Sequence, residues 1–287
     1  MKYNYRICGL RVCFDIPWPL KITTESSPFL ISPEDTCAPD LMVRFCVAED
    51  LSLPGQGGVW NINAYYCACE QELRIWHCPV RGMLPFCCVI WRKDRPGSVE
   101  CLVARGQEEQ IAYTKNLTDL LGLEAFLLHF GGLILHSSLV DWGGRGILFC
   151  APCGTGKSTQ AELWETHMGS RTLNGDRAGI RCENGTWRAW GLPFAGTSGI
   201  YRNESVPVRA VVLLRQGPEN ILTPVRPPEA FRRMLPECSA RRWDSDFMNR
   251  LIGVLSALVT DVPVYQLTCR PDREAVELLR DTIMKET

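Results

Sequence analysis

The sequence predicts an α/β protein in two parts, a β-rich N-terminal segment and a C-terminal α/β domain. Three observations lead to this expectation. Residues 1–115 contain short apolar runs separated by Pro, Gly, Ser and Asp, which is typical of strands and turns. Residues 116–132 change to helical spacing and end in two glycines. Residues 146–167 read as a strand, a glycine-rich loop and a helix in that order. We therefore expect two domains, 1–115 and 116–287.

The composition narrows the class of protein. The 287 residues include 31 Lys and Arg against 32 Asp and Glu, so there is no basic field to gather nucleic acid or anionic lipid. The N-terminus lacks the pattern of a secretory signal, and no run of 18 apolar residues follows. Fifteen cysteines are an odd number and fit a reducing compartment better than a disulfide framework. We expect a cytoplasmic protein that binds neither nucleic acid nor a membrane.

The N-terminal runs are expected to form an antiparallel sheet in which most cysteines are small buried apolar residues. Cys67, Cys69, His77 and Cys78 offer an alternative, because they could converge on a metal ion without showing a zinc spacing in the sequence. This segment also has a candidate role: an exposed sheet edge could take an extended peptide as an added strand.

The C-terminal part alternates strands and helices. Periodicity and turn residues predict strands at 133–142, 146–152, 178–183, 186–190, 208–216 and 262–269. They predict helices at 154–167, 228–235, 244–261 and 272–284. The apolar residues of the helix at 244–261 have the spacing of a core-facing stripe.

Residues 151–158, APCGTGKS, match a relaxed phosphate-loop (P-loop) pattern in which Ala151 replaces the first glycine. Gly154 and Gly156 allow backbone angles that turn amide N–H groups inward, and the following helix adds its positive end. Lys157 supplies a charge for the terminal phosphates, and Ser158 a hydroxyl for Mg²⁺. The residues expected to bind a nucleotide here are Cys153, Gly154, Thr155, Gly156, Lys157, Ser158 and Thr159.

The segment LHSSLVDWGGRGILFCAPCGTGKS resembles the corresponding segment of the HPr kinase/phosphorylase family, whose nucleotide-binding fold is shared with phosphoenolpyruvate carboxykinase. In both, a His begins a strand and stands 21 residues before the loop lysine; here these are His136 and Lys157. The segment TLNGDRAGI is similar to the family's pair of aspartates followed by Arg, with Asp176 as one acid and Gly175 in place of the other.

Residues 190–217 resemble a divergent group of HPr-kinase-related proteins, many from gene clusters that make modified peptides. The resemblance covers roughly 133–280 and does not extend to 1–115. It implies a P-loop core of the HPr kinase type that uses ATP and Mg²⁺. The implied activity is transfer of the γ-phosphoryl group to a hydroxyl, as of Ser or Thr in a peptide or small protein. It leaves the choice of ATP or GTP and the oligomeric state open.

Within this resemblance, Lys157, Asp176 and His136 form the candidate catalytic set. Asp176 is expected to act as the base or to join Ser158 as a ligand of Mg²⁺; its alternative role is a turn with Asn174. His136 is expected to donate to a phosphate or polarise the acceptor; its alternative is a core residue.

Three further possibilities accompany this prediction. Arg202 lies in a Gly- and Ser-rich loop and is expected to bind the nucleotide or acceptor anion, unless it is simply solvated. Cys150 and Cys153 could form a redox switch at the loop entrance. The same site could instead serve a kinase of small metabolites, or a nucleotide-binding regulator in which the missing second acid reflects lost catalysis.

Overall fold

The computed structural model describes residues 1–32, 37–194 and 196–285. The chain divides into two compact units, Met1–Leu123 and Glu124–Thr287. The division falls inside the segment 116–132, which forms two helices and not the single helix expected: α1 (Thr114–Leu121) and α2 (Leu123–His129). Gly122 separates them because its φ of 64° is left-handed, a conformation in which glycine commonly ends a helix.

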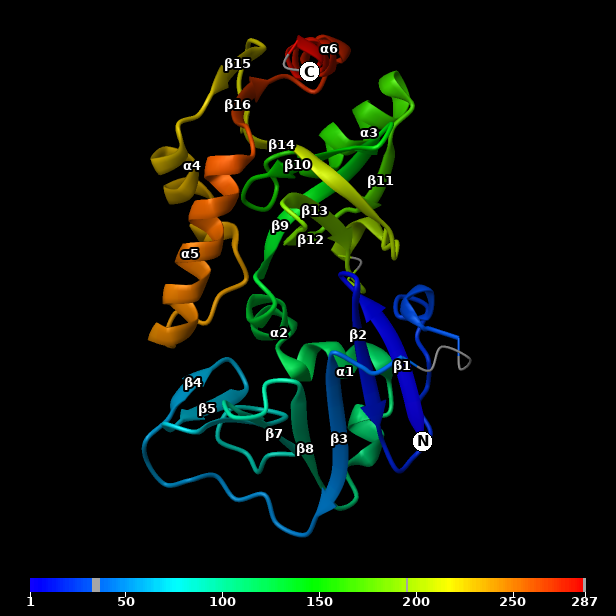
Figure 1. Cartoon of the computed structure of the whole chain (residues 1–287), viewed down its shortest axis with the longest axis vertical. Helices are drawn as coiled ribbons and strands as arrows, with labels where there is room; N and C mark the ends of the chain where they lie inside the picture. Colours follow the sequence, from blue (N-terminus) through cyan, green and yellow to red (C-terminus); the bar gives the residue numbers. More distant parts are fainter. Residues whose placement is uncertain (33–36, 195, 286–287) are drawn as a thin grey trace. The chain divides into compact units, whose positions relative to one another are not determined.

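The N-terminal unit is built on one eight-stranded sheet with the order β1-β2-β3-β8-β7-β6-β5-β4 (Figure 1). Its strands are β1 (Lys2–Ile7), β2 (Leu10–Asp15), β3 (Leu41–Ala48), β4 (Val59–Asn61), β5 (Ala64–Ala68), β6 (Glu72–His77), β7 (Cys87–Arg92) and β8 (Ser98–Ala104). Two 3-10 helices, η1 (Ser27–Phe29) and η2 (Glu108–Ile111), lie in its connections. The expectation of an antiparallel sheet is wrong in part, because β3 is parallel to both β2 and β8. The long connection 16–40 makes this possible, since parallel neighbours need a crossover.

Both faces of this sheet bury side chains. In β8, Val99, Cys101 and Val103 are buried and their neighbours are partly exposed, as expected for a period of two. In β7, Cys87–Ile90 are all buried, because Cys88 and Ile90 belong to a second apolar cluster on the other face. Six cysteines of this unit are buried: Cys8, Cys13, Cys78, Cys87, Cys88 and Cys101. They therefore serve as small apolar residues in the core.

The C-terminal unit is a second sheet with flanking helices. Its elements are β9 (Gly132–Trp142), β10 (Arg145–Cys150), α3 (Lys157–Met168), β11 (Arg171–Asn174), β12 (Arg177–Glu183), β13 (Thr186–Gly191), η3 (Gly196–Ser198), β14 (Ser205–Gln216), β15 (Ile221–Pro224), α4 (Pro227–Met234), η4 (Leu235–Glu237), α5 (Ser245–Asp261), β16 (Val264–Cys269) and α6 (Arg273–Lys285). The strands β11 and β15 were not expected from the sequence.

The strand order is β10-β9-β12-β13-β14-β16-β15, with β11 paired to β9. An additional pairing joins β10 to β14, so that β10, β9, β12, β13 and β14 form a closed circuit of hydrogen-bonded neighbours. Strands β10, β14 and β16 are parallel to one another. Their carboxyl ends consequently lie at one edge, which is where open α/β sheets place their ligands.

Two apolar cores cover the two faces of this sheet. Alternate residues of β10 point to opposite cores: Ile147 and Phe149 to one, Leu148 and Cys150 to the other. Helices α3 and α6 pack on the first face, and α4 and α5 on the second. Figure 1 shows α4 and α5 next to each other, in agreement with their contacts. This arrangement holds the start of α3 at the edge where β10 ends.

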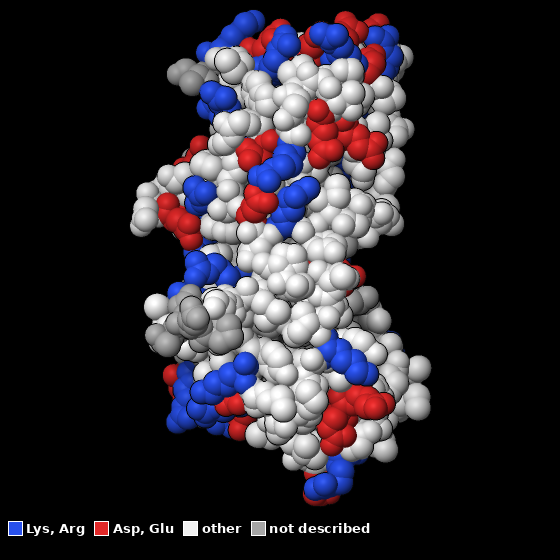
Figure 2. All heavy atoms as spheres, turned by 90° about the vertical axis from the view of Figure 1, so that its right-hand side faces the viewer, with Lys and Arg blue, Asp and Glu red and all other residues white. Residues whose placement is uncertain are grey.

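Charge on the surface is mixed. Figure 2 shows acidic and basic side chains interspersed over the face that it displays, without an extended patch of one sign. Within residues 1–32, 37–194 and 196–285, none of the helices has the length and apolar character needed to span a bilayer.

Candidate functional site

The predicted phosphate loop connects the end of β10 to the start of α3. Gly154 and Gly156 have φ values of +77° and +108°, and both angles lie in the region that favours glycine. Ala151 is not among the residues with positive φ, so alanine is tolerated at the place of the first glycine. The loop therefore has the backbone geometry that the sequence predicts for it.

Lys157 is folded back onto this loop. Its ammonium Nζ donates to the carbonyl oxygens of Ala151 at 2.7 Å and Pro152 at 3.2 Å, and the residue is only 8% exposed. No side chain caps the N-terminus of α3, and its first turn contains no acidic residue. The N–H groups of that turn have no partner within the helix, so the loop combines free donors, a helix dipole and one cation. These features fit an anion such as a phosphate.

The other predicted nucleotide ligands lie at the surface of the loop. Cys153, Ser158 and Thr159 are exposed, and Thr155 is half-buried. Helix α3 is anchored below them by Trp164, which is fully buried and packs edge-on against Trp142 with ring centroids 5.3 Å apart. The hydroxyl groups are thus accessible while the helix that carries them is fixed.

His136 lies next to the start of the loop because of the register of β9. Ser137 pairs with Cys150, the last residue of β10, and His136 pairs with Arg177 on the other side. Paired residues in neighbouring strands are about 5 Å apart. The register therefore brings His136 close to both Ala151 and the turn that carries Asp176.

Asp176 faces His136, with 3.8 Å between Oδ1 and the imidazole Nε2. The turn around it is made by Asn174, whose Oδ1 accepts from the N–H groups of residues 176 and 177, at 2.9 Å each. Asn174 is fully buried, and its Nδ2 donates to the carbonyl oxygens of Leu192 and Phe194. Asp176 therefore takes part in a turn with Asn174 through its N–H, as its alternative role expects. Its carboxylate is 29% exposed and also lies 3.4 Å from Nε of Arg177.

Glu237 is a third member of this cluster that the sequence reasoning missed. Its Oε2 lies 3.0 Å from Nδ1 of His136, and its side chain is 15% exposed. The two residues are separated by 101 positions in the chain, and Glu237 ends the short helix η4, so no periodicity marks it. His136 is thereby held by Glu237 at Nδ1, while the Asp176 carboxylate lies near Nε2 at 3.8 Å, beyond hydrogen-bond distance. A carboxylate at Nδ1 fixes the orientation and tautomer of an imidazole.

Gly175 stands where the resemblance places a second acid, and the structure leaves no room for a side chain there. A Cβ at this position would lie 2.2 Å from Oγ of Ser198. The same loop approaches Asp176 through Gly196, where a Cβ would lie 2.7 Å from Cβ of Asp176. The segment around residues 196–198 thus occupies the space of the missing acid.

Arg202 is not placed at the phosphate loop. Its Nε donates to the carbonyl oxygen of Thr172 at 3.1 Å, and Thr172 pairs with Val140 of β9. Ser137 is the residue of β9 that pairs with the last residue of β10. Val140 is three residues further along β9, away from that end of β10. Nε of Arg202 is thus engaged on β11, and the role of Arg202 as a nucleotide ligand stays a prediction.

Ser158 and Asp176 have oxygen donors of the kind that Mg²⁺ prefers. Within the described part of the chain no hydrogen bond joins the two side chains, and no group of three or more His, Cys, Asp and Glu residues is arranged to hold a metal ion. Mg²⁺ commonly retains water and takes only one or two protein ligands together with substrate phosphates, so Ser158 and Asp176 stay predicted ligands of this ion.

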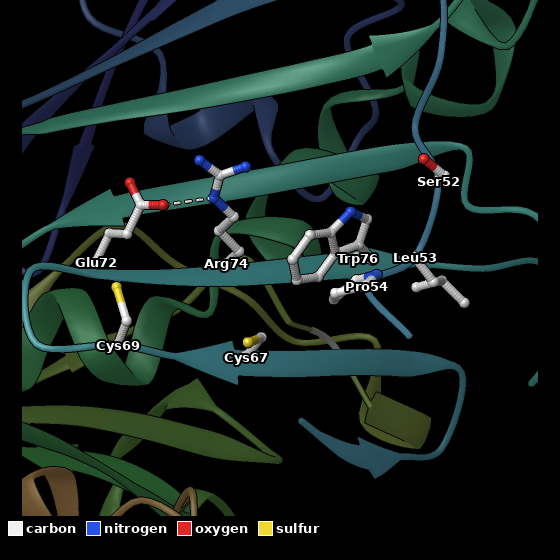
Figure 3. Close-up of a pocket in the computed structure, with 8 residues that line it drawn as sticks. All are labelled: Ser52, Leu53, Pro54, Cys67, Cys69, Glu72, Arg74 and Trp76. Carbon is white, nitrogen blue, oxygen red and sulfur yellow. Dashed lines mark hydrogen bonds and ion pairs between the residues drawn. The ribbon is translucent and has the colours of Figure 1, made fainter. Parts of the chain in front are cut away.

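Among the described residues, the N-terminal cysteines and His77 form no group that could hold a metal ion. Cys67 pairs with Arg74 across the β5–β6 hairpin, whereas His77 pairs with Ala64, three residues further along the strand. That offset is about 10 Å at the rise of a β-strand. Figure 3 shows Cys67 and Cys69 instead beside a surface pocket that contains the ion pair of Glu72 and Arg74.

The proposed redox switch is also not supported. Cys150 is 1% exposed and points into the core shared with α5, and burial raises the pKa of its thiol. A buried protonated thiol reacts slowly, because the thiolate is the nucleophile. Cys153 is exposed on the loop, but its predicted partner is not accessible.

Comparison with known proteins gives one similar solved structure and one matching family model. Among solved structures, the HPr(Ser) kinase/phosphatase from Coxiella burnetii is similar, with 12% identity over 53% of this chain and 97% of that chain and a TM-score of 0.33. This TM-score is too low to establish a shared fold. The comparison with curated proteins finds no match. A family model described as "SynChlorMet cassette protein ScmC" matches residues 100–271, more than half of the chain. The chain therefore belongs to the ScmC family.

Proposed function

We propose that this chain is a kinase that uses ATP and Mg²⁺ to phosphorylate a hydroxyl group, as of Ser or Thr in a peptide or small protein. The observation that carries the proposal is the register of β9, which brings His136 and the adjacent Asp176 to the start of the loop 151–158, whose Gly154 and Gly156 have positive φ. A phosphate cradle and a carboxylate–imidazole pair within one strand spacing are the parts that phosphoryl transfer needs.

The loop would bind the nucleotide phosphates through its backbone. Nζ of Lys157 donates to the carbonyl oxygens of Ala151 and Pro152. A bound triphosphate would offer anionic oxygens in their place, and a hydrogen bond between two charged groups is about twice as strong as one to a neutral carbonyl. Lys157 would then neutralise charge on the terminal phosphates. Mg²⁺, held by Ser158 and Asp176, would supply further charge neutralisation there.

Asp176 would receive the proton of the acceptor. In the reaction the acceptor oxygen forms a bond to the γ-phosphorus, the bond from that phosphorus to the β–γ bridging oxygen breaks, and ADP leaves. The hydroxyl proton passes to the carboxylate of Asp176, which is partly exposed and accessible to an acceptor. This role and metal coordination both remain within the proposal.

His136 would orient the reacting groups. Its Nδ1 is held by Glu237 at 3.0 Å, which leaves Nε2 directed at Asp176 and the loop entrance. Glu237 therefore acts as a positioning residue.

A peptide acceptor is favoured by the resemblance of residues 190–217 to HPr-kinase-related proteins, many of which come from gene clusters that make modified peptides. Delivery of that peptide along an edge of the N-terminal sheet has less support. The N–H of Ile31 donates to the carbonyl oxygen of Asn4 at 2.8 Å, so the outer side of β1 is partly paired, and β4 at the other edge has only three residues. The acceptor is best sought among peptides encoded beside this chain.

The test is transfer of labelled γ-phosphate from ATP, with Mg²⁺, to candidate peptides and small hydroxylated metabolites. Transfer to a peptide would support the proposal. Lys157→Ala and Asp176→Asn should each abolish it, while Glu162→Ala, an exposed position on the same helix as Lys157, should leave it unchanged. Transfer only to a metabolite would show that the acceptor is a small metabolite and not a peptide. Binding of ATP without any transfer would instead indicate a regulator.

A further inference from the structure

A pocket adjoins the phosphate loop on the side away from His136. It has a volume of about 400 Å³ and lies where β14 and β16 end, beside the first turn of α3. Residues of the loop and of that turn, including Gly156 and Thr159, form one wall. The strand ends, including Gln216 and Arg270, form the other. The pocket is therefore continuous with the loop that we propose to bind phosphates.

The strand order indicates how a nucleotide would lie across the carboxyl ends of β10, β14 and β16. The neighbours of β10 are β9 on one side and β14, followed by β16, on the other. His136 and Asp176 belong to the β9 side, and the pocket belongs to the β14 and β16 side. A nucleotide with its phosphates on the loop would thus direct its terminal phosphate toward His136 and its base toward the pocket.

The pocket has the chemistry of a site for a flat, nitrogen-rich ring. Its walls combine the apolar side chains of Leu214 and Pro271 with the amides of Gln160 and Gln216. An apolar cavity of 300–1,000 Å³ with a few placed polar groups is typical of small-molecule sites. A Gln amide is the side chain that can both accept from the amino group of adenine and donate to a ring nitrogen.

Gln160 has an unmet hydrogen-bonding group. The residue is 3% exposed, its Nε2 donates to Sγ of Cys269 at 3.3 Å, and its Oε1 is buried without a hydrogen-bond partner. An unpaired buried acceptor is costly, and native proteins rarely retain one. The terminal torsion of Gln is broad, so a small rotation of the amide would present this oxygen to a ligand donor in the pocket. The 6-amino group of adenine is such a donor, whereas guanine carries an acceptor at that position.

The opposite wall is held in place by its own contacts. Arg270 donates from Nε to Asp272 and from one terminal nitrogen to Glu274, both at 2.8 Å, which fixes the plane of its guanidinium. An Arg plane can stack on an aromatic ring. Gln216 Nε2 donates to the carbonyl oxygen of Gly154 at 3.3 Å, so the rim of the pocket is linked directly to the phosphate loop.

We propose that this pocket binds the adenine base of the nucleotide, so that the chain selects ATP over GTP. The proposal rests on the proposed function, because it assumes that the loop holds the phosphates. Gln160 would be the specificity-determining residue, and Arg270 would cover one face of the ring.

Calorimetric titration of the full chain, with Mg²⁺ present, tests the proposal with three ligands: ATP, GTP and inorganic tripolyphosphate. We expect ATP to bind at least about tenfold more tightly than GTP or tripolyphosphate, since one matched base contact discriminates to this extent. Equal affinities for all three would overturn the base pocket and leave the phosphate loop intact. Tighter binding of GTP would overturn the choice of adenine, and a lack of binding by all three would overturn the proposed function as well.

Two test variants and one control variant show whether the preference for ATP arises in this pocket. Thr159→Trp places a large side chain in the pocket from an exposed position on α3 and should abolish the preference for ATP over GTP. Thr166→Trp, exposed on the same helix outside the pocket, is the matched control. Gln160→Leu should reduce the ATP-to-GTP preference by about tenfold without changing tripolyphosphate affinity. If Thr159→Trp retains full preference for ATP, the base does not bind here.

Discussion

Gly175 is packed so closely against Ser198 that one methyl group at position 175 should destabilise the C-terminal unit. A Cβ at this position would lie 2.2 Å from Oγ and 2.5 Å from Cβ of Ser198. Normal contacts between carbon atoms are about 3.5–4.0 Å. The φ of Gly175 is not positive, so alanine brings no left-handed strain and the penalty is steric. Overpacking costs about 1–3 kcal/mol, and we expect Gly175→Ala to lower the free energy of unfolding by this amount.

Ser198→Gly removes both atoms that the new methyl group would meet. The double variant should therefore recover most of the loss, with a coupling free energy of about 1–3 kcal/mol in a double-mutant cycle measured by urea denaturation. Gly253→Ala is a suitable control, because it lies in α5 and its Cβ would meet nothing within 4 Å. It should stabilise the chain by about 0.5–1 kcal/mol. A neutral Gly175→Ala, or losses that simply add in the double variant, would refute the packing argument.

Three further predictions concern Glu237, Asn174 and the buried thiols of Cys88 and Cys238. Glu237→Gln should slow phosphoryl transfer by about tenfold to a hundredfold with little change in ATP affinity, since it weakens the bond that orients His136; nitrogen NMR shifts of that ring should change with it, and unchanged shifts and rates would contradict a positioning role. Asn174→Ala should lower the free energy of unfolding by about 3 kcal/mol, because it leaves two N–H and two carbonyl groups without their partner; a loss below about 1 kcal/mol would be inconsistent with this. Burial raises the pKa of the Cys88 and Cys238 thiols to about 12, so above pH 9 the unfolded chain loses these protons while the folded chain keeps them. The resulting stability is complete below pH 9 and should fall by about 1.4 kcal/mol per thiol per pH unit above it. Urea titrations at pH 8 and pH 10 check this, and Cys238→Ala should show a shallower fall.

The parts of the site that depend on neighbouring residues could be predicted from the sequence. Gly154 and Gly156 have the positive φ values that the loop pattern requires, and Lys157 begins the helix that was expected after it. The strand with His136 and the four C-terminal helices were also predicted, because each has a long periodic stretch. Such patterns can be recognised from consecutive residues alone, without knowledge of distant contacts.

The parts that depend on distant contacts could not be predicted. Glu237 reaches His136 from a three-residue helix that has no periodicity, and Arg202 has the residue type of a phosphate ligand but its Nε is engaged on β11. The pocket beside the loop is assembled from three separate segments. A helix interruption at Gly122 was missed because a glycine within an apolar helical pattern does not by itself show whether it adopts the left-handed conformation.

The most direct test of the account is calorimetric titration of the full chain with ATP in the presence of Mg²⁺. Because the loop offers free N–H groups, a helix N-terminus and the ammonium of Lys157, we predict saturable binding at one site, lost in Lys157→Ala and retained in Glu162→Ala. Saturable binding that Lys157→Ala leaves unchanged, or no binding to the folded wild-type chain, would contradict the assignment of residues 151–158 as a phosphate loop.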